Sequence, residues 1–170
     1  IASSLVGSEM CIRDSYIATG SSVHNQMVYT IDHHSGSEEH QLGEEYFDRT
    51  IYDEELGRVN TVPLMQSNLQ QFDESRWVIP ILANANSIAP SWGTELGLLF
   101  IDGSHTETSA MNDYDNWCSK LHPQGGLVIH DIYEKPEDGG QAPYLIYQKA
   151  LAEGFQLHER VDTIVCLTKT

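Results

Sequence analysis

Alternating runs of apolar and polar residues predict a chain of strands and helices. Short runs rich in apolar and β-branched residues are typical of buried strands. They occur at residues 27–32 (MVYTID), 77–82 (WVIPIL), 98–102 (LLFID), 127–131 (LVIHD), 155–161 and 163–168. Pro80 has no backbone N–H to donate, so we expect the second of these strands to lie at an edge of the sheet. The last two strands are close enough in sequence to form a hairpin.

Apolar residues spaced three and four apart predict helices between these strands. The spacing is clearest from Ala110 to Leu121, where Pro123, Gly125 and Gly126 are expected to end the helix before a strand that begins at Leu127. Weaker patterns predict helices at residues 62–72 and 142–153, with a short helix or turn at 87–92. Residues 33–48 are polar and have no apolar period, so we expect a long loop there.

Strands joined by helices in this way favour an α/β fold. We predict a Rossmann-like, mostly parallel sheet with helices on both faces and a C-terminal antiparallel hairpin. The length of 170 residues suits a single domain. Residues 3–15 (SSLVGSEMCIRDS), however, resemble a translated sequencing-adapter read-through. We therefore expect residues 1–15 to be non-native, and residues 16–170 to form a domain whose amino-terminal strand and helix are missing or replaced.

The chain is strongly acidic, with 25 acidic residues against 9 basic ones and a formal net charge of -16. Such a charge repels nucleic-acid backbones and anionic membrane surfaces, so we expect neither as a partner. The cysteines, Cys11, Cys118 and Cys166, are widely spaced and form no C-x-x-C pair, which favours a reducing cytoplasm. No apolar run approaches the roughly 20 residues that span a bilayer.

The predicted strands at 98–102 and 127–131 each end in a carboxylate, Asp102 and Asp131. Because ligands bind at the carboxyl ends of strands in an open α/β sheet, these two side chains should face one crevice. Oxygen ligands of this kind suit a divalent metal, with Mg²⁺ as the first choice. His130 is either a third ligand, which would favour a transition metal, or a buried histidine bonded to the backbone. The structural alternative for Asp102 is a cap on the following helix.

The sequence also resembles a known family. The string FIDGSH, the helix after it and the string LHPQGGLVIHD are similar, in order and spacing, to the fourth strand, helix, L-x-P-x-G-G turn and fifth strand of class I S-adenosylmethionine-dependent methyltransferases, in a metal-dependent O-methyltransferase-like branch. The resemblance covers residues 16–170. It implies methyl transfer from S-adenosylmethionine to a hydroxyl of a small molecule, assisted by a divalent metal ion. The sequence is compatible with a homo-oligomer.

The resemblance implies roles for individual residues. Asp32, which closes the second strand, would bind the ribose hydroxyls of the cofactor, and Asn84 and Ala85 would contact its adenine. His105, three residues beyond Asp102, would take the hydroxyl proton, because histidine titrates near neutrality. Asp32 and His105 also have structural alternatives: Asp32 could begin a loop, and His105 could be an ordinary residue of a first helical turn.

Two other functions stay open. Asp32, His33 and His34 match the DHH triplet of a phosphoesterase family. A two-metal hydrolase would combine this triplet with Asp102, His105, His130 and Asp131. Alternatively, the chain is a non-catalytic truncated remnant, since Gly7 is the one glycine where relatives carry a glycine-rich loop.

Overall fold

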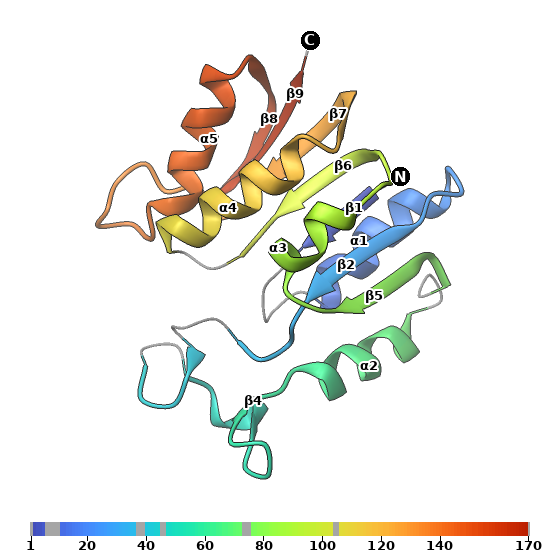
Figure 1. Cartoon of the computed structure of the whole chain (residues 1–170), viewed down its shortest axis with the longest axis vertical. Coiled ribbons are helices and arrows are strands. Elements are labelled where there is room, and N and C mark those ends of the chain that lie inside the picture. The colour runs from blue at the N-terminus through green and yellow to red at the C-terminus, as the bar shows by residue number, and fades with distance from the viewer. Residues whose placement is uncertain are drawn as a thin grey trace.

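A seven-stranded sheet, in the order β5-β2-β1-β6-β7-β9-β8, forms the centre of the computed structural model (Figure 1). The structure describes residues 2–5, 11–36, 40–44, 47–72, 76–103 and 106–169. The strands of the sheet are β1 (Ala2–Leu5), β2 (Val28–Asp32), β5 (Val78–Leu82), β6 (Leu96–Ile101), β7 (Leu121–Ile129), β8 (Phe155–Val161) and β9 (Ile164–Lys169). Strands β5, β2, β1, β6 and β7 pair in parallel, whereas β9 is antiparallel to β7 and β8. The predicted α/β class, mostly parallel sheet and C-terminal hairpin are confirmed.

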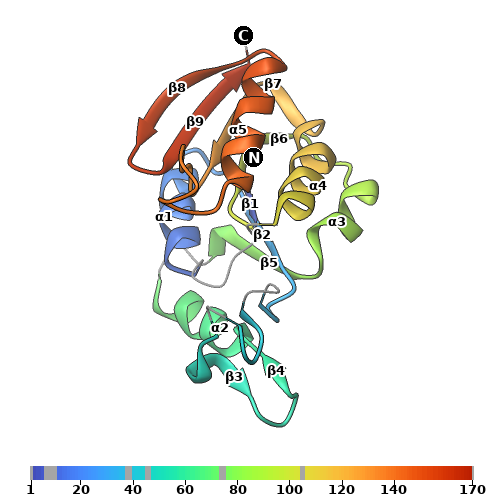
Figure 2. The same cartoon turned by 90° about the vertical axis from the view of Figure 1, so that its left-hand side faces the viewer.

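Helices cover both faces of this sheet (Figure 2). They are α1 (Cys11–Ser22), α2 (Val62–Gln71), α3 (Ala85–Ile88), α4 (Glu107–Cys118) and α5 (Ala142–Ala152), with 3-10 turns at Arg49–Ile51 and Ala89–Ser91. The larger apolar cluster joins α3, α4 and α5 to one face, and the smaller joins α1 and α2 to the other. Leu99 belongs to the first cluster and its neighbour Leu98 packs on the second, as successive side chains of a strand point to opposite faces.

An amino-terminal strand and helix are present, so these elements are not missing, and that they replace native ones stays a prediction. β1 pairs in parallel with β2 and with β6, and Leu5 is the register partner of both Ile31 and Ile101. A strand at this position satisfies backbone groups that β2 and β6 would otherwise leave unpaired. That residues 1–15 are non-native stays a prediction. Residues 6–10, which include Gly7, lie outside the described residues.

Strand β7 begins at Leu121 rather than at Leu127. The register shifts between two pairs, Leu96 with Leu121 and Leu98 with Gly126, so the intervening residues of β7 form an irregularity in the ladder. A Cβ on Gly125 would lie 2.8 Å from Cγ of Leu121 and 2.9 Å from the carbonyl oxygen of His122, which explains the glycine. The prolyl and glycyl residues therefore shape a strand here instead of only ending the preceding helix.

One smaller element of the structure differs from the prediction, and another agrees with it. A short hairpin, β3 (Tyr52–Asp53) with β4 (Arg58–Val59), was not predicted, because two-residue strands carry no periodic signal. β5 occupies an edge of the sheet, as Pro80 predicts. Within the described part of the chain, no helix combines the length and the apolar character that crossing a membrane requires.

Candidate active site

The order of the strands identifies one edge of the sheet as the ligand-binding edge. From β1 the chain moves outward to β2 and β5, then returns to β6 on the other side of β1, so the strand order reverses there. In open α/β sheets, ligands bind outside the carboxyl ends of the strands at such a reversal. Asp32 closes β2 and Asp102 directly follows β6, so both residues lie at this edge beside β1.

Asp102, His130 and Asp131 come together at the ends of β6 and β7. One ligand atom from each of the three lies within 4.8 Å of the other two, and all three residues are half-buried. Nδ1 of His130 is 3.2 Å from Oδ1 of Asp102 and 3.2 Å from Oδ1 of Asp131. Asp102 and Asp131 therefore lie close together, as expected, and that they face one crevice stays a prediction. No other group of three or more such side chains is found among the described residues.

The neighbouring strands dictate this convergence. Ile101 and Ile129 are register partners, and the backbone N–H of His130 extends the pairing by donating to the carbonyl of Ile101. Asp131 then leaves the strand with a φ of 58°, a left-handed conformation that aspartate tolerates better than most residues. Ile132 is buried and donates its N–H to the carbonyl of Thr163, which fixes the chain beyond the turn.

The donor set of this cluster suits a divalent cation. Two carboxylates that converge in a half-buried site repel each other unless a positive charge lies between them. A bound divalent metal ion would supply such a charge. Carboxylate oxygens suit Mg²⁺, and an imidazole nitrogen also suits transition metals, so the residues present fit an ion of either kind.

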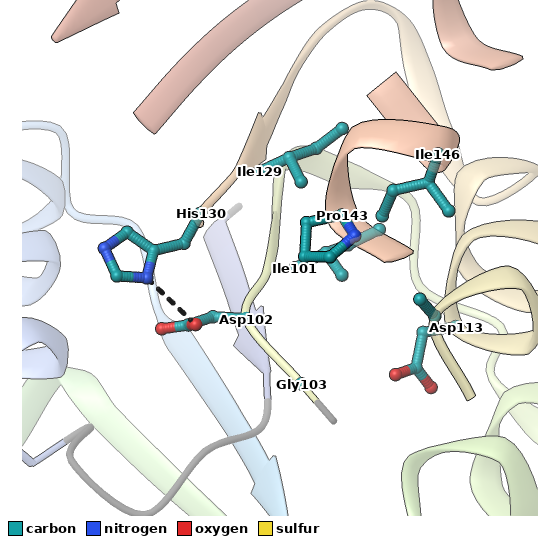
Figure 3. A pocket seen from close by; sticks show the side chains of 9 residues that line it. Ile101, Asp102, Gly103, Asp113, Ile129, His130, Pro143 and Ile146 are labelled. Atoms are coloured by element: carbon teal, nitrogen blue, oxygen red, sulfur yellow. Dashed lines mark hydrogen bonds and ion pairs between the residues drawn. The ribbon is translucent and has the colours of Figure 1, made fainter. Parts of the chain in front are cut away.

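A small open pocket adjoins the cluster, between the strand ends and the helices α4 and α5. Its apolar lining is formed by Ile101, Ile129, Pro143 and Ile146 (Figure 3). Asp102 and His130 contact each other on one side of this lining, and Asp113 lies on the other (Figure 3).

Asp113 was not predicted as a functional residue. Its side chain accepts a hydrogen bond from Nδ2 of Asn86 at 2.9 Å, and Oδ1 of Asn86 accepts one from Asn116 at 2.8 Å, so α4 holds α3 through this network. Burial raises the pKa of Asp113 to about 6, although the bond from Asn86 opposes the shift. Its spacing from Ala110 and Trp117, three and four residues, places this acid on the buried face and is the signal that could have identified it.

Asp32 is buried where the predicted ribose-binding acid should be. Only 6% of the residue is exposed, and its Oδ1 accepts the backbone N–H of His34 at 2.8 Å. Its carbonyl accepts the N–H of Ala83, which links the ends of β2 and β5. Burial lowers the pKa of His34, an effect that the nearby Asp32 carboxylate opposes.

The segment predicted to contact adenine follows β5. Asn84 is the N-cap of α3, and its Oδ1 accepts the backbone N–H groups of Asn86 and Ser87. Asn84 is exposed at the ligand-binding edge, whereas Ala85 is buried in the core. His105, the predicted base, lies outside the described residues, and its role stays a prediction.

Comparison with known proteins agrees with this arrangement. A family model described as a methyltransferase domain matches residues 14–132. The structure is similar to that of the O-methyltransferase NovP, with a TM-score of 0.67 and 16% identity over 99% of this chain and 72% of that one. A proposed O-methyltransferase from Klebsiella pneumoniae gives a TM-score of 0.63 at 12% identity, covering 99% of this chain and 73% of that one.

A third structure carries a ligand. It is a proposed methyltransferase from Streptococcus mutans in complex with S-adenosylhomocysteine, with a TM-score of 0.55 and 13% identity over 100% of this chain and 89% of that one. At these identities the three likenesses show the shared fold.

Proposed function

The chain belongs to the methyltransferase-domain family of S-adenosylmethionine-dependent enzymes, and from this premise we propose that it methylates a hydroxyl of a small molecule with the help of a divalent metal ion. The observation that carries the proposal is the convergence of Asp102, His130 and Asp131 beside the strand-order reversal. In such a reaction the methyl carbon breaks its bond to the sulfonium sulfur and forms one to the acceptor oxygen. The products are S-adenosylhomocysteine, a methyl ether and the released hydroxyl proton.

The cofactor would lie across the carboxyl ends of β1, β2 and β5. Asp32 supports this placement, because a carboxylate at the end of β2 has acceptor oxygens for both hydroxyls of a ribose. Asn84 would contact the adenine through its exposed side chain, and Ala85 would contact it through its backbone. The side-chain oxygen of Asn84 already caps α3, so the side-chain NH2 group is the part proposed to contact the base.

Asp102, His130 and Asp131 are the residues proposed to hold the metal ion. A divalent ion bound there would lower the pKa of the acceptor hydroxyl and hold its oxygen near the methyl group. Mg²⁺ fits the two carboxylates best, with His130 as the third ligand or as a hydrogen-bonding neighbour of both. His105, three residues beyond Asp102, is proposed as the base that takes the hydroxyl proton.

A small-molecule acceptor agrees with the charge of the chain. The net charge of -16 would repel the phosphates of a nucleic acid, and a neutral sugar-like or phenolic hydroxyl would suffer no such repulsion.

The geometry does not favour a hydrolase built on Asp32, His33 and His34. This triplet is not among the described groups that could hold a metal ion, and Nδ1 of His34 is hydrogen-bonded to the hydroxyl of Thr61. The truncated-remnant alternative is weakened because β1 lies in the sheet and α1 packs against it.

Calorimetry with S-adenosylhomocysteine and with Mg²⁺ or Mn²⁺ tests the proposal directly. We expect both to bind to the chain, and methyl transfer to a panel of hydroxylated acceptors to stop when a chelator is added. If calorimetry detects binding of neither ligand, the proposal is refuted. Binding of the cofactor together with transfer that is unaffected by chelator would remove the metal ion from it.

A further inference from the structure

Residues 33–61 connect β2 to α2, and His34 and Thr61 close this connection at its two ends. The backbone N–H of Thr61 donates to the carbonyl of His34 at 3.1 Å, and Nδ1 of the His34 ring is 2.7 Å from Oγ1 of Thr61. Both residues are buried, with exposures of 7% and 2%. We call this pair the neck of the connection. It joins residues that are 27 positions apart, immediately beyond the end of β2.

The neck is bonded to the carboxylate of Asp32. Oδ1 of Asp32 accepts the backbone N–H of His34 at 2.8 Å, and Oδ2 lies 3.9 Å from Nδ1 of the His34 ring. The backbone and the ring of one residue therefore adjoin both oxygens of the carboxylate. This arrangement fixes the direction in which the Asp32 side chain points.

The backbone of His34 needs support to make these contacts. Its φ of 54° lies in the left-handed region, which residues other than glycine adopt uncommonly and at some cost. The ring bond to Thr61 supplies part of that support, because Thr61 is itself fixed at the start of α2, where its carbonyl accepts the N–H of Met65. Thr61 thus anchors the ring, and the ring anchors the backbone that contacts Asp32.

We propose that His34 is a positioning residue for cofactor binding: anchored on Thr61, it holds the Asp32 carboxylate in the orientation that receives the ribose hydroxyls. This inference rests on the proposed function and deepens it. A carboxylate has about four lone-pair sites, so the N–H of His34 leaves acceptor capacity for a diol. A carboxylate that is already fixed loses little rotational freedom when the cofactor binds, which strengthens binding.

Thr61→Val tests the neck, because it removes the hydroxyl while keeping the shape of the side chain and its backbone N–H. We expect the Kd for S-adenosylhomocysteine, measured by calorimetry on the full chain, to rise about tenfold, the upper range for one hydrogen bond. Thr61→Ser keeps the hydroxyl and should stay within about twofold of the parent. Thr50→Val is the matched control, because it removes an exposed hydroxyl of the same connection that bonds to Asp48.

An Asp32→Asn background separates positioning from general loosening. The amide keeps an oxygen for the N–H of His34 but lacks the charge that binds the diol, so Thr61→Val should there change the Kd by less than about twofold. The same tenfold loss in both backgrounds would overturn the inference. So would equal losses in Thr61→Ser and Thr61→Val, or an unchanged Kd in Thr61→Val.

A second variant keeps the test decisive if Thr61→Val does not fold. His34→Asn tolerates the left-handed backbone but is too short to reach Thr61, so it should weaken binding to a similar extent. An unchanged Kd in His34→Asn would overturn the inference. If the parent chain binds S-adenosylhomocysteine normally and only these variants behave unexpectedly, the positioning role fails alone. If the parent chain does not bind it, the proposed function and this inference fail together.

Discussion

His130 and Asp102 lie 28 positions apart in sequence, yet Nδ1 of His130 is 3.2 Å from Oδ1 of Asp102. The contact exists because parallel pairing of β6 and β7 aligns Ile101 with Ile129 and brings the next residues of both strands to the same edge. The same nitrogen is 3.2 Å from Oδ1 of Asp131. One ring nitrogen is thus close to both carboxylates, and a metal ion bound by the three residues would balance the charge of the two aspartates.

Removing either carboxylate should abolish tight metal binding. We expect Asp102→Ala and Asp131→Ala each to weaken binding of Mg²⁺ or Mn²⁺ by about 100-fold, because each loses a charged ligand. The Kd for S-adenosylhomocysteine should change much less, since Asp32 belongs to a different strand. Calorimetry with each ligand separately measures both effects.

Asp115→Ala is the control for these two variants. Asp115 is an exposed acid of α4 that pairs with Lys149, so its removal lowers the negative charge equally without touching the cluster. Equal loss of metal affinity in all three variants would mean that the overall negative charge attracts the ion and that the cluster does not bind it specifically.

The convergence of Asp102 and Asp131 could be predicted because both strands are buried on both faces and therefore read as continuous apolar runs. Strand β1 could not be predicted in the same way. Residues 2–5 (ASSL) carry a weak apolar signal, and their conformation is set by pairing with β2 and β6. A local pattern does not contain that information.

The neck was hidden for a related reason. The triplet at residues 32–34 is visible in the sequence, but the burial of His34 depends on Thr61, which lies 27 positions away. The acid at Asp113 differs, because its spacing on α4 already places it among buried neighbours. The parts of this site that the sequence did not predict are those that depend on contacts between residues far apart in the chain.

Asp113 should make the protein less stable as the pH rises. Its pKa is raised to about 6 in the folded state, so the folded chain holds this proton more tightly than the unfolded chain does. The free energy of unfolding should therefore fall as the pH increases from about 4 to about 6, by up to about 3 kcal/mol, and remain lower above that range. Urea unfolding at several pH values measures this change.

Asp113→Asn should remove this dependence, because the amide keeps the acceptor for Asn86 and has no proton to lose. The variant should be more stable than the parent at pH 7.5 and closer to it at pH 4. Asp115→Asn, on the exposed side of the same helix, should keep the pH dependence of the parent. A parent and an Asp113→Asn variant with parallel pH profiles would contradict the assignment.

His34, in contrast to Asp113, should make the protein more stable as the pH rises. Burial lowers its pKa below the ordinary value of 6.5, so the unfolded chain takes up a proton before the folded chain does. This contribution is fully present above pH 6.5 and is lost as the pH falls below it. The stability difference between the parent and His34→Asn should therefore shrink from pH 7.5 to pH 5.5. A difference that is constant over this range would show that His34 does not titrate on unfolding.

The two glycines of β7 should differ in their tolerance of a methyl group. A Cβ on Gly125 would lie 2.8 Å from Cγ of Leu121 and 2.9 Å from the carbonyl oxygen of His122, and the latter cannot move without shifting the strand. A Cβ on Gly126 would meet only Cδ1 of Leu98, at 3.1 Å, which is the end of a flexible side chain. Gly125→Ala should therefore lower the free energy of unfolding by about 1–3 kcal/mol.

Gly126→Ala is the matched comparison and should cost clearly less than Gly125→Ala in the same urea titration. Because Gly125 lies in the irregular part of β7, its substitution should also disturb the strand that carries His130 and Asp131, and so weaken metal binding. Gly126→Ala should leave metal binding close to that of the parent. If both alanine variants unfold at the same urea concentration, then the close contact of residues 121 and 122 with Gly125 does not explain why residue 125 is a glycine.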